Sequence, residues 1–359
     1  MERFTLHNDA IKDLSGLQVA SRSIWNPAVY RQIGDIIRRV RPAIVHCHNT
    51  FPMVSPAVYY AAGAAHVPVV QTLHNYRLIC PAATLYRESH LCEECVGHFI
   101  PYSSVLHRCY RGNRLASLAV ATMLTTHHAL GTWGRKVQTY ITPTHFMRNK
   151  LLEGGLPSAR VSVKPNFLAM DPGQGEGEGG YVLFAGRLAE EKGLATLLRA
   201  WDELPDIPLR VVGDGPLRAF VQTRAGAMNN VSVEGFCDTD QVLELMKRAA
   251  CVVVPSQWYE GFPMTVIEAM ACGTPVVGSC LGSLREVLQS GITGEHFEAG
   301  NARDLARCVR RLMSDPLKLQ QLRERARSHF EKNFMAKRNY ELLRQIYESA
   351  IKAYPSRSV

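Results

Sequence analysis

The pattern of apolar and polar positions alternates along most of the chain between short strand-like runs and longer amphipathic segments. Short, nearly continuous apolar runs are typical of strands buried on both faces of a parallel sheet. Such runs occur at residues 42–46, 67–73, 137–141, 161–163, 181–185, 209–213, 231–235 and 272–278. Polar turns and segments of helical periodicity separate them. The sequence therefore predicts an α/β protein built on parallel sheets.

The length of 359 residues predicts more than one domain, because single hydrophobic cores seldom grow that large. Residues 171–180, Asp-Pro-Gly-Gln-Gly-Glu-Gly-Glu-Gly-Gly, have the composition of a flexible linker. We therefore expect an N-terminal domain over 1–172 and a Gly-rich linker over 173–180. A C-terminal domain over 181–335 and a final helix over 336–359 would follow.

Two carboxylates, Glu260 and Glu268, flank a Gly-Phe-Pro turn that predicts the start of a helix. Pro263 suits the first helical position, because the N–H that it lacks would have no partner there. The free N–H groups at a helix start carry partial positive charge and suit a phosphate. Glu268 would lie roughly 12 Å further along, at ~1.5 Å per residue. One carboxylate could then contact a sugar and the other a ribose, and the alternative is an amphipathic helix with a surface Glu at each end.

Two cations, Arg187 and Lys192, follow the apolar run at 181–185 on a predicted strand-to-helix turn. Arginine can bind a pyrophosphate through two hydrogen bonds, and lysine binds it as a point charge. This turn therefore predicts a diphosphate site.

The motifs of the second half resemble those of a known family. They are F-x-G-R-L-x-x-x-K-G at 184–193, V-x-G-D-G-P at 211–216 and E-G-F-P-x-x-x-x-E-A-M-A-C-G-x-P-V-V at 260–277. Together they resemble the retaining GT-B glycosyltransferases of family 4 (glycosyl transferases group 1), over nearly all of residues 181–300. The resemblance implies two facing Rossmann-like domains with a cleft between them. It also implies transfer of a sugar from a nucleotide-sugar to an acceptor hydroxyl with retention of configuration.

Carried over residue by residue, the resemblance implies that Arg187 and Lys192 hold the diphosphate, that Glu260 contacts the donor sugar and that Glu268 binds the ribose. It adds the helix start and the loops near the base to the donor site: Gly261, Phe262, Pro263, Met264, Thr265, Gly213, Phe236 and Cys237. The implied donor is a UDP- or GDP-sugar, and no catalytic metal is expected. The triplet 238–240, Asp-Thr-Asp, could suggest a metal site, but its spacing to Gln241 predicts a helix capping box instead.

Histidines follow the two early apolar runs, at His46, His48 and His74. Ligands of open α/β sheets bind at such strand ends. His74 matches the position where the family has a histidine facing the donor sugar, so we expect His74 to act beside Glu260 as a sugar or acceptor contact. His48 is the second candidate, and a structural histidine at a strand end is the alternative for both.

The start of the chain departs from the family pattern. No Gly-Gly pair follows an apolar run in residues 4–25, so we expect the family's first strand, its glycine loop and the next helix to be missing. A misassigned start, a cut boundary or a genuine truncation would each explain this. The loss would expose a sheet edge and put activity in question. Alternatives to transfer are therefore a sugar-nucleotide-binding or scaffold protein, and a GT-B-shaped epimerase or hydrolase.

The insert at residues 74–114 carries four cysteines that predict a structural zinc site. Cys92 and Cys95 form a C-x2-C pair, and Cys80 and Cys109 would complete a tetrahedral set. Reduced, apolar thiols are the alternative. The insert follows His74 directly, so its arginines could meet an anionic acceptor.

Charge is distributed unevenly. Residues 1–170 hold 18 Lys and Arg against 8 Asp and Glu, whereas the remainder holds 23 against 24. A basic first half suggests an anionic partner, such as a lipid headgroup surface or a lipid-linked acceptor, and a solvated basic surface is the alternative. Nucleic acid is not expected, because the basic residues are dispersed and no recognition module occurs.

No segment predicts a signal peptide or a membrane-spanning helix, and the start is polar and acidic. We therefore expect a cytoplasmic protein that contacts the membrane at most peripherally. Within the resemblance, the helix at 336–359 would cross back onto the N-terminal domain, and a surface helix of the second domain is the alternative. The implied role is cell-surface polysaccharide or glycolipid synthesis.

Overall fold

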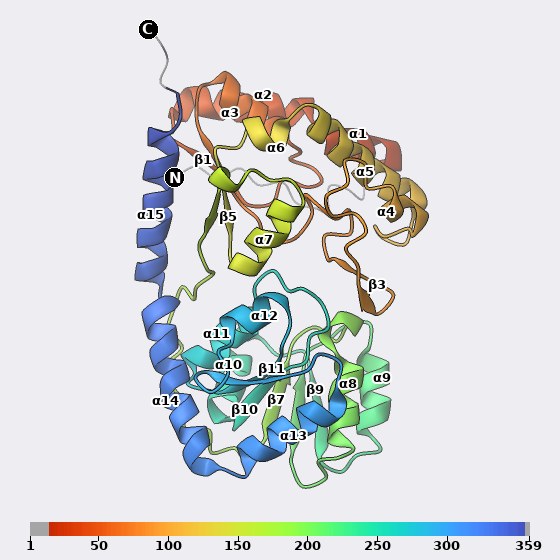
Figure 1. Cartoon of the computed structure of the whole chain (residues 1–359), viewed down its shortest axis with the longest axis vertical. Coiled ribbons are helices and arrows are strands. Elements are labelled where there is room, and N and C mark those ends of the chain that lie inside the picture. The colour runs from red at the N-terminus through yellow and green to blue at the C-terminus, as the bar shows by residue number, and fades with distance from the viewer. Residues whose placement is uncertain (1–13, 356–359) are drawn as a thin grey trace. The chain divides into compact units, whose positions relative to one another are not determined.

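The computed structural model describes residues 14–355, which form two compact α/β units (Figure 1). The first unit comprises the chain up to Arg87, Cys92–Lys164 and the chain from Glu341 on. The second comprises Glu88–Leu91 and Pro165–Tyr340. The expectation of a missing first strand depends largely on residues 1–13, which lie outside the described residues.

The first unit is built on a four-stranded sheet in the order β1-β2-β5-β6, in which all neighbours are parallel. Its C-terminal strand ends therefore meet at one edge. The strands are β1 Val45–Cys47, β2 Val69–Thr72, β5 Thr139–Thr142 and β6 Val161–Val163. The helices are α1 Gly16–Ile24, α2 Pro27–Val40, α3 Ala57–Ala64, α4 Ser103–Leu106, α5 Arg114–Ala129, α6 Thr132–Arg135, α7 His145–Glu153, the 3-10 turn Ser158–Arg160 and α15 Ala336–Lys352. A separate two-stranded ribbon pairs β3 Tyr86–Arg87 with β4 His90–Leu91.

The final helix, α15, packs on the sheet of the first unit. Ile346, Tyr347 and Ala350 cluster with Val70 of β2 and Ile141 of β5. These apolar positions recur at spacings of three and four, so that one stripe of the helix is covered. The chain thus completes the first unit with residues that follow the whole second unit in the sequence.

The second unit is built on a six-stranded parallel sheet in the order β12-β11-β10-β7-β8-β9. The strands are β7 Val182–Ala185, β8 Leu209–Val212, β9 Val231–Gly235, β10 Cys251–Val254, β11 Val276–Ser279 and β12 Gly294–Phe297. The helices are the 3-10 turn Glu190–Lys192, α8 Leu194–Trp201, α9 Arg218–Ala225, α10 Thr239–Arg248, α11 Met264–Ala271, α12 Gly282–Val287, α13 Ala302–Met313 and α14 Pro316–Asn333. Chain order reverses between β7 and β10, which makes this pair the topological switch point of a doubly wound sheet.

Alternate residues of the central strands feed two separate cores, one on each face of this sheet. Val182 and Phe184 of β7 pack with helices α8 and α13, for example with Trp201. Leu183, between them, packs on the other face with helices α11 and α14, for example with Phe330. Because side chains of a strand alternate between faces, a run that is apolar at every position requires helices on both sides.

The predicted Gly-rich linker is part of the second unit, so the first unit's main segment ends at Lys164 rather than near residue 172. Backbone N–H groups of Gly175, Gly177 and Gly179 donate to carbonyls of Cys272, Lys247 and Arg248, respectively. Glycine permits this close approach, because a Cβ on Gly175 would lie 2.3 Å from the Lys247 carbonyl oxygen. Composition predicted flexibility here, but backbone pairing fixes the segment.

Within residues 14–355, none of the helices combines the length and the apolar character that crossing a membrane requires.

Candidate functional site

The switch point of the second unit brings together the residues that the motifs singled out. Arg187 and Lys192 follow β7, and Glu260 follows the neighbouring strand β10. In open α/β sheets, ligands bind beyond the carboxyl ends of the strands at this crevice. The sheet topology therefore assigns the candidate site to the region that the sequence predicted.

Lys192 and Glu260 form an ion pair with little solvent access at the centre of this site. The Lys192 Nζ lies 2.9 Å from the Glu260 Oε1, and the Glu260 side chain is only 9% exposed. Ser256 donates a second hydrogen bond to the same carboxylate oxygen. The ammonium group also lies 5.7 Å from the centre of the Trp258 ring. These contacts fix the orientation of the Glu260 carboxylate, which is largely shielded from solvent.

Arg187, by contrast, is held only loosely. Its guanidinium pairs with Glu191, four residues further along the chain, and its side chain is 64% exposed. An exposed pair at this spacing contributes well under 1 kcal/mol. Arg187 can therefore exchange Glu191 for an anionic ligand at small cost.

Glycines allow the loops of this site to approach one another closely. Gly193 has φ +74°, and a Cβ there would lie 1.9 Å from the Pro255 carbonyl oxygen. Gly213 has φ +137°, and its Cβ would lie 1.9 Å from the Gly186 carbonyl oxygen. Only glycine fits either position. Gly193 thus lets the Lys192 turn pack against the end of β10. Gly213 lets the loop after β8 pack against the backbone of the loop after β7.

The predicted helix start is present, but it begins one residue later than expected. Helix α11 starts at Met264, and Pro263 is its N-cap residue. No side chain caps this end. The first N–H groups of α11, at Met264 and Thr265, therefore lie at a helix start that carries partial positive charge, with Gly261 and Phe262 in the preceding turn.

Glu268 lies along α11 and is half-buried. Burial raises the pKa of its carboxyl group above the ordinary value. Its side chain makes no hydrogen bond or ion pair to any of the described residues. A partly desolvated carboxylate without a protein partner is suited to accept hydrogen bonds from a ligand.

The predicted base-side residues differ in exposure. Phe236 is 78% exposed, which leaves its ring available for stacking, whereas Cys237 packs against the core. The following residues form the predicted capping box, in which Asp238 and Gln241 each accept from the other's backbone N–H. The Asp-Thr-Asp triplet thus begins α10, as its spacing predicted.

Sequence reasoning missed Ser256 and Trp258, although both precede Glu260 directly in the chain. Ser256 is buried and orients the carboxylate, and the Trp258 ring covers Lys192. Both residues follow β10, a strand that was not predicted. Had β10 been recognised as a strand of the switch point, the residues that follow it would have been candidates for the site.

Comparisons with known proteins agree with this geometry. Two family models match consecutive parts of the chain: Glycosyltransferase Family 4 matches residues 15–171, and Glycosyl transferases group 1 matches residues 171–329. Over these ranges the chain resembles glycosyltransferase family 4 in its first half and the group 1 glycosyltransferases in its second half.

Curated relatives are similar to this chain over parts of their length. A glycogen synthase of Mycobacterium tuberculosis is 29% identical over 252 residues, which cover 66% of this chain and 60% of the relative. An uncharacterized glycosyltransferase of Methanocaldococcus jannaschii is 35% identical over 140 residues, or 37% of this chain and 36% of the relative. The chain thus spans between about one third and three fifths of these curated relatives.

A solved structure shares the fold. The crystal structure of Anabaena Alr3699/HepE in complex with UDP has a TM-score of 0.68 at 18% identity, over 89% of this chain and 82% of that chain. At this identity the likeness shows the fold, which is GT-B.

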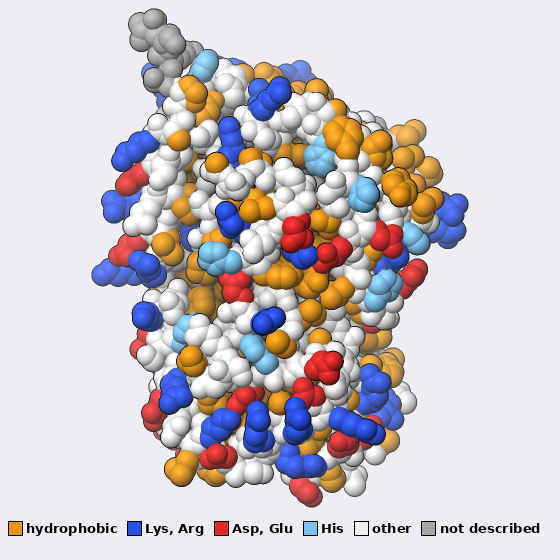
Figure 2. Space-filling model, viewed as in Figure 1, with side chains coloured by type: hydrophobic (Ala, Val, Ile, Leu, Met, Phe, Trp, Pro, Cys, Tyr) orange, Lys and Arg blue, Asp and Glu red, His pale blue; other side chains and the backbone are white. Residues whose placement is uncertain are grey.

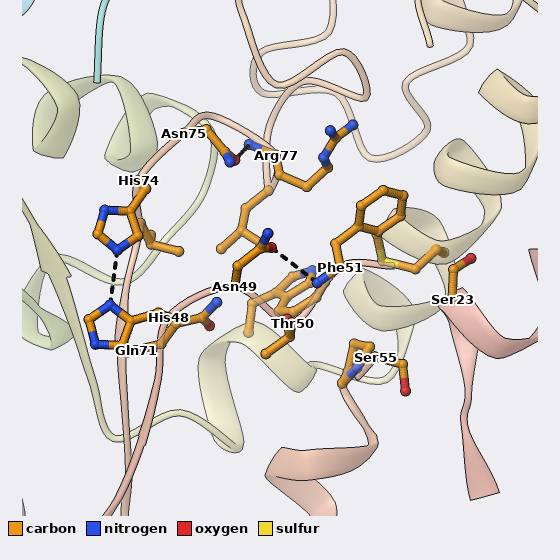
Figure 3. A pocket seen from close by; sticks show the side chains of 15 residues that line it. Ser23, His48, Asn49, Thr50, Phe51, Ser55, Gln71, His74, Asn75 and Arg77 are labelled. Atoms are coloured by element: carbon orange, nitrogen blue, oxygen red, sulfur yellow. Dashed lines mark hydrogen bonds between the residues drawn. The ribbon is translucent and has the colours of Figure 1, made fainter. Parts of the chain in front are cut away.

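The first unit has a pocket of about 210 Å³ at the C-terminal ends of β1 and β2 (Figure 3). Phe51, Leu78 and Trp133 supply apolar walls, and His48 and His74 line one side. Arg77 is the one charged residue of the lining, and its guanidinium stacks on the ring of Phe51. The pocket is therefore lined by both apolar and polar side chains, and none of its lining residues carries a carboxylate.

The side-chain amide oxygens of three residues in this lining accept hydrogen bonds from other groups of the protein. The Asn49 Oδ1 accepts from the Phe51 N–H at 3.2 Å, and the Asn75 Oδ1 accepts from the Arg77 N–H at 3.0 Å (Figure 3). Because backbone N–H groups can only donate, the amide orientation is fixed. The Gln71 Oε1 accepts from Tyr59 at 2.6 Å. The NH2 groups of all three remain to donate to a ligand rich in oxygen.

The histidines predicted at these strand ends form one cluster. The His48 Nδ1 and the His74 Nε2 are 3.0 Å apart, so one donates and the other accepts (Figure 3). Burial lowers the pKa of His48, with Lys164 as a second cause, and burial and His48 lower the pKa of His74. Burial therefore favours the neutral form of both rings. His46 is structural in its contacts, since its ring bridges Thr72 and Tyr347 of α15.

The four cysteines predicted to bind zinc are free thiols. Burial, and secondarily Cys80, raises the pKa of Cys95 to about 12, and burial also raises the pKa of Cys109. Zinc ligands must be thiolates. Across residues 14–355, no three His, Cys, Asp or Glu side chains are grouped so that they could hold a metal ion. These pKa directions describe the metal-free thiols, because a bound metal deprotonates its ligands, so the zinc site at Cys80, Cys92, Cys95 and Cys109 stays a prediction.

Proposed function

We propose that this chain transfers a sugar from a nucleotide-sugar donor to an acceptor hydroxyl with retention of configuration. The observation that carries the proposal is the switch point of the second unit, where a covered Lys192–Glu260 pair lies beside the uncapped start of α11. Cations and helix-start N–H groups stabilise the charge that develops on a departing diphosphate. Glu260 would orient the sugar, and Glu268 would accept hydrogen bonds from the ribose.

A UDP-sugar is the donor that we favour over a GDP-sugar, because Alr3699/HepE, which shares the fold, is a complex with UDP. Arg187 and Lys192 supply positive charge at the diphosphate, so we propose that transfer requires no catalytic metal. Phe236, exposed after β9, would stack on the base.

The pocket of the first unit is the proposed acceptor site. Its carboxamide NH2 groups suit a ligand rich in hydrogen-bond acceptors, and His74 would contact the sugar or the acceptor hydroxyl. The glycogen synthase among the relatives makes a polysaccharide, which supports a role for this chain in polysaccharide or glycolipid synthesis.

The test is a panel of UDP-, GDP- and ADP-glucose, measured for nucleoside diphosphate release with and without EDTA, and with NMR of the product anomer. We expect the UDP-sugar to turn over, EDTA to have no effect, and Glu260→Gln to lower kcat at least 100-fold while UDP still binds. Glu295→Gln is the matched control, because Glu295 is equally buried and paired, with Lys318, on the far strand β12. Equal loss in both variants, or strict metal dependence, would contradict the proposal.

A further inference from the structure

Large apolar side chains are exposed together around α4 and α5 of the first unit. Their exposed fractions lie between 50% and 76%, for Phe99, Ile100, Tyr102, Leu106, Leu115 and Leu118. Helices α4 and α5 pack against each other, so these residues share one surface, here named the α4–α5 face. Figure 2 shows hydrophobic side chains gathered where Figure 1 has these helices. Single exposed apolar residues are ordinary, but a gathered group marks an interaction surface.

The outward side of α5 has no charge beyond its first residue. After Arg114 the helix reads Leu-Ala-Ser-Leu-Ala-Val-Ala-Thr-Met-Leu-Thr-Thr-His-His-Ala, without Lys, Arg, Asp or Glu. Leu115, Leu118, Thr122 and Ala129 are exposed at helical spacing. A helix on the surface of a globular protein normally turns charged residues outward. The outer side of α5 is instead suited to a medium less polar than water.

Positive charge borders this apolar surface, whereas Glu94, the carboxylate that contacts α4 through Ser103, is paired with Arg87. Arg108 and Arg111 are exposed on the connection from α4 to α5, and Arg114 is exposed at the first position of α5. None of the three forms an ion pair with another described residue. Between Glu94 and Glu153 the sequence has no Asp or Glu, although it has seven Lys and Arg. The face therefore combines apolar and cationic groups.

We propose that the α4–α5 face binds the surface of an anionic lipid bilayer. The leucines and Phe99 would enter the boundary between headgroups and acyl chains, Tyr102 would lie at the headgroup level, and the arginines would contact lipid phosphates. Charge complementarity favours this occupant over a second copy of the chain, since a symmetric contact would gather the three arginines of both copies in one interface. The inference goes beyond sugar transfer and does not depend on the donor site.

The first test is flotation of the full chain with vesicles of phosphatidylcholine, with or without phosphatidylglycerol. We expect binding to the anionic vesicles that falls as salt is raised, because exposed charges are screened. Exchange of Leu106, Leu115 and Leu118 together for Ser is expected to weaken binding at least tenfold. Leu317→Ser is the control, since Leu317 is 79% exposed on α14 of the second unit. Because all of these side chains are exposed, the variants are expected to keep the wild-type Tm.

The second test reverses the charge with Arg108→Glu and Arg111→Glu, beside Arg303→Glu of the second unit as control. Each arginine near an anionic surface contributes about fivefold to partitioning, so we expect the double variant to lose at least 25-fold. Equal flotation of wild type and variants would overturn the proposal. So would a dimer, seen by sedimentation, that the leucine variant abolishes. UDP calorimetry on the same proteins reports the donor site separately.

Discussion

The two glutamates of the donor motif differ in how the protein holds them. Glu260 is covered and receives hydrogen bonds from Lys192 and Ser256, so its position is fixed before any ligand arrives. Glu268 is half-buried and makes no contact of this kind to the described residues, and burial raises its pKa. A fixed carboxylate suits orientation of a reacting sugar, whereas an uncommitted one suits ligand binding.

Lys164 gives a residue-scale prediction about stability. It follows β6 and is buried, and desolvation lowers its pKa from 10.5 to about 8. Between these pH values the unfolded chain holds a proton that the folded protein has released. The free energy of unfolding therefore rises with pH across this window, by about 3 kcal/mol in total.

Urea unfolding of wild type and Lys164→Met at several pH values between 7 and 11 checks this. We expect the variant to be the more stable protein at pH 7 and its advantage to vanish by about pH 10.5. Lys337→Met, at an exposed lysine of α15, should show no such trend. A difference between wild type and Lys164→Met that does not change with pH would disprove the shift.

Residue chemistry was predictable where a motif and a strand end coincided. Arg187 and Lys192 follow a predicted apolar run that ends in glycine and a charged turn, whereas Glu260 was singled out by its motif, because the strand before it, β10, was not predicted. The zinc site of the insert stays a prediction, because C-x2-C spacing reports proximity along the chain and not the geometry of four ligands. Ser256 and Trp258 were missed because their role depends on contacts across loops.

At the scale of elements, glycines determine how closely the loops of the donor site approach. Gly193→Ala would place a Cβ 1.9 Å from the Pro255 carbonyl oxygen, in a backbone with φ +74°. Gly180 has nearly the same backbone, φ +67°, with nothing within 4 Å of its Cβ position. We expect Gly180→Ala to cost about 1–2 kcal/mol for the left-handed conformation alone, and Gly193→Ala about 4 kcal/mol or more.

Urea denaturation measures both costs, and UDP calorimetry reports the site. Gly193→Ala should weaken UDP binding, because the Lys192 turn must move, whereas Gly180→Ala should not. Equal costs in the two variants would show that backbone conformation, and not close approach, explains the glycine at 193.

The strands also show what pattern alone can and cannot predict. The run 181–185 was found because every position is apolar, as in a strand between two layers. β12, Gly294–Phe297, was not predicted, because it contains Glu295 and His296. Pairing of Glu295 with Lys318 and Arg311 is a tertiary feature that no local pattern reveals. The Gly-rich segment 173–180 was misread for the same reason.

At the scale of the whole molecule, the chain folds as two α/β units, and the last helix of the chain, α15, completes the first unit. The second unit carries the proposed donor site on a doubly wound sheet, and the first carries a pocket rich in hydrogen-bond donors and the α4–α5 face. Donor binding, acceptor binding and surface attachment are thus assigned to separate elements, so each can be altered by variants that leave the others in place.

Calorimetry of UDP binding tests whether the second unit binds a nucleoside diphosphate with Glu268 on the ribose. Wild type should bind, and Glu268→Gln should weaken binding about 10- to 100-fold, since a hydrogen bond to a charged group contributes about 1.5–3 kcal/mol. Glu324→Gln, at an exposed glutamate of α14, should bind as wild type does. Wild-type affinity should also fall on acidification at a higher pH than an ordinary carboxyl would give, because burial raises the pKa of Glu268. Failure of wild type to bind UDP, or equal affinity in Glu268→Gln, would contradict the account.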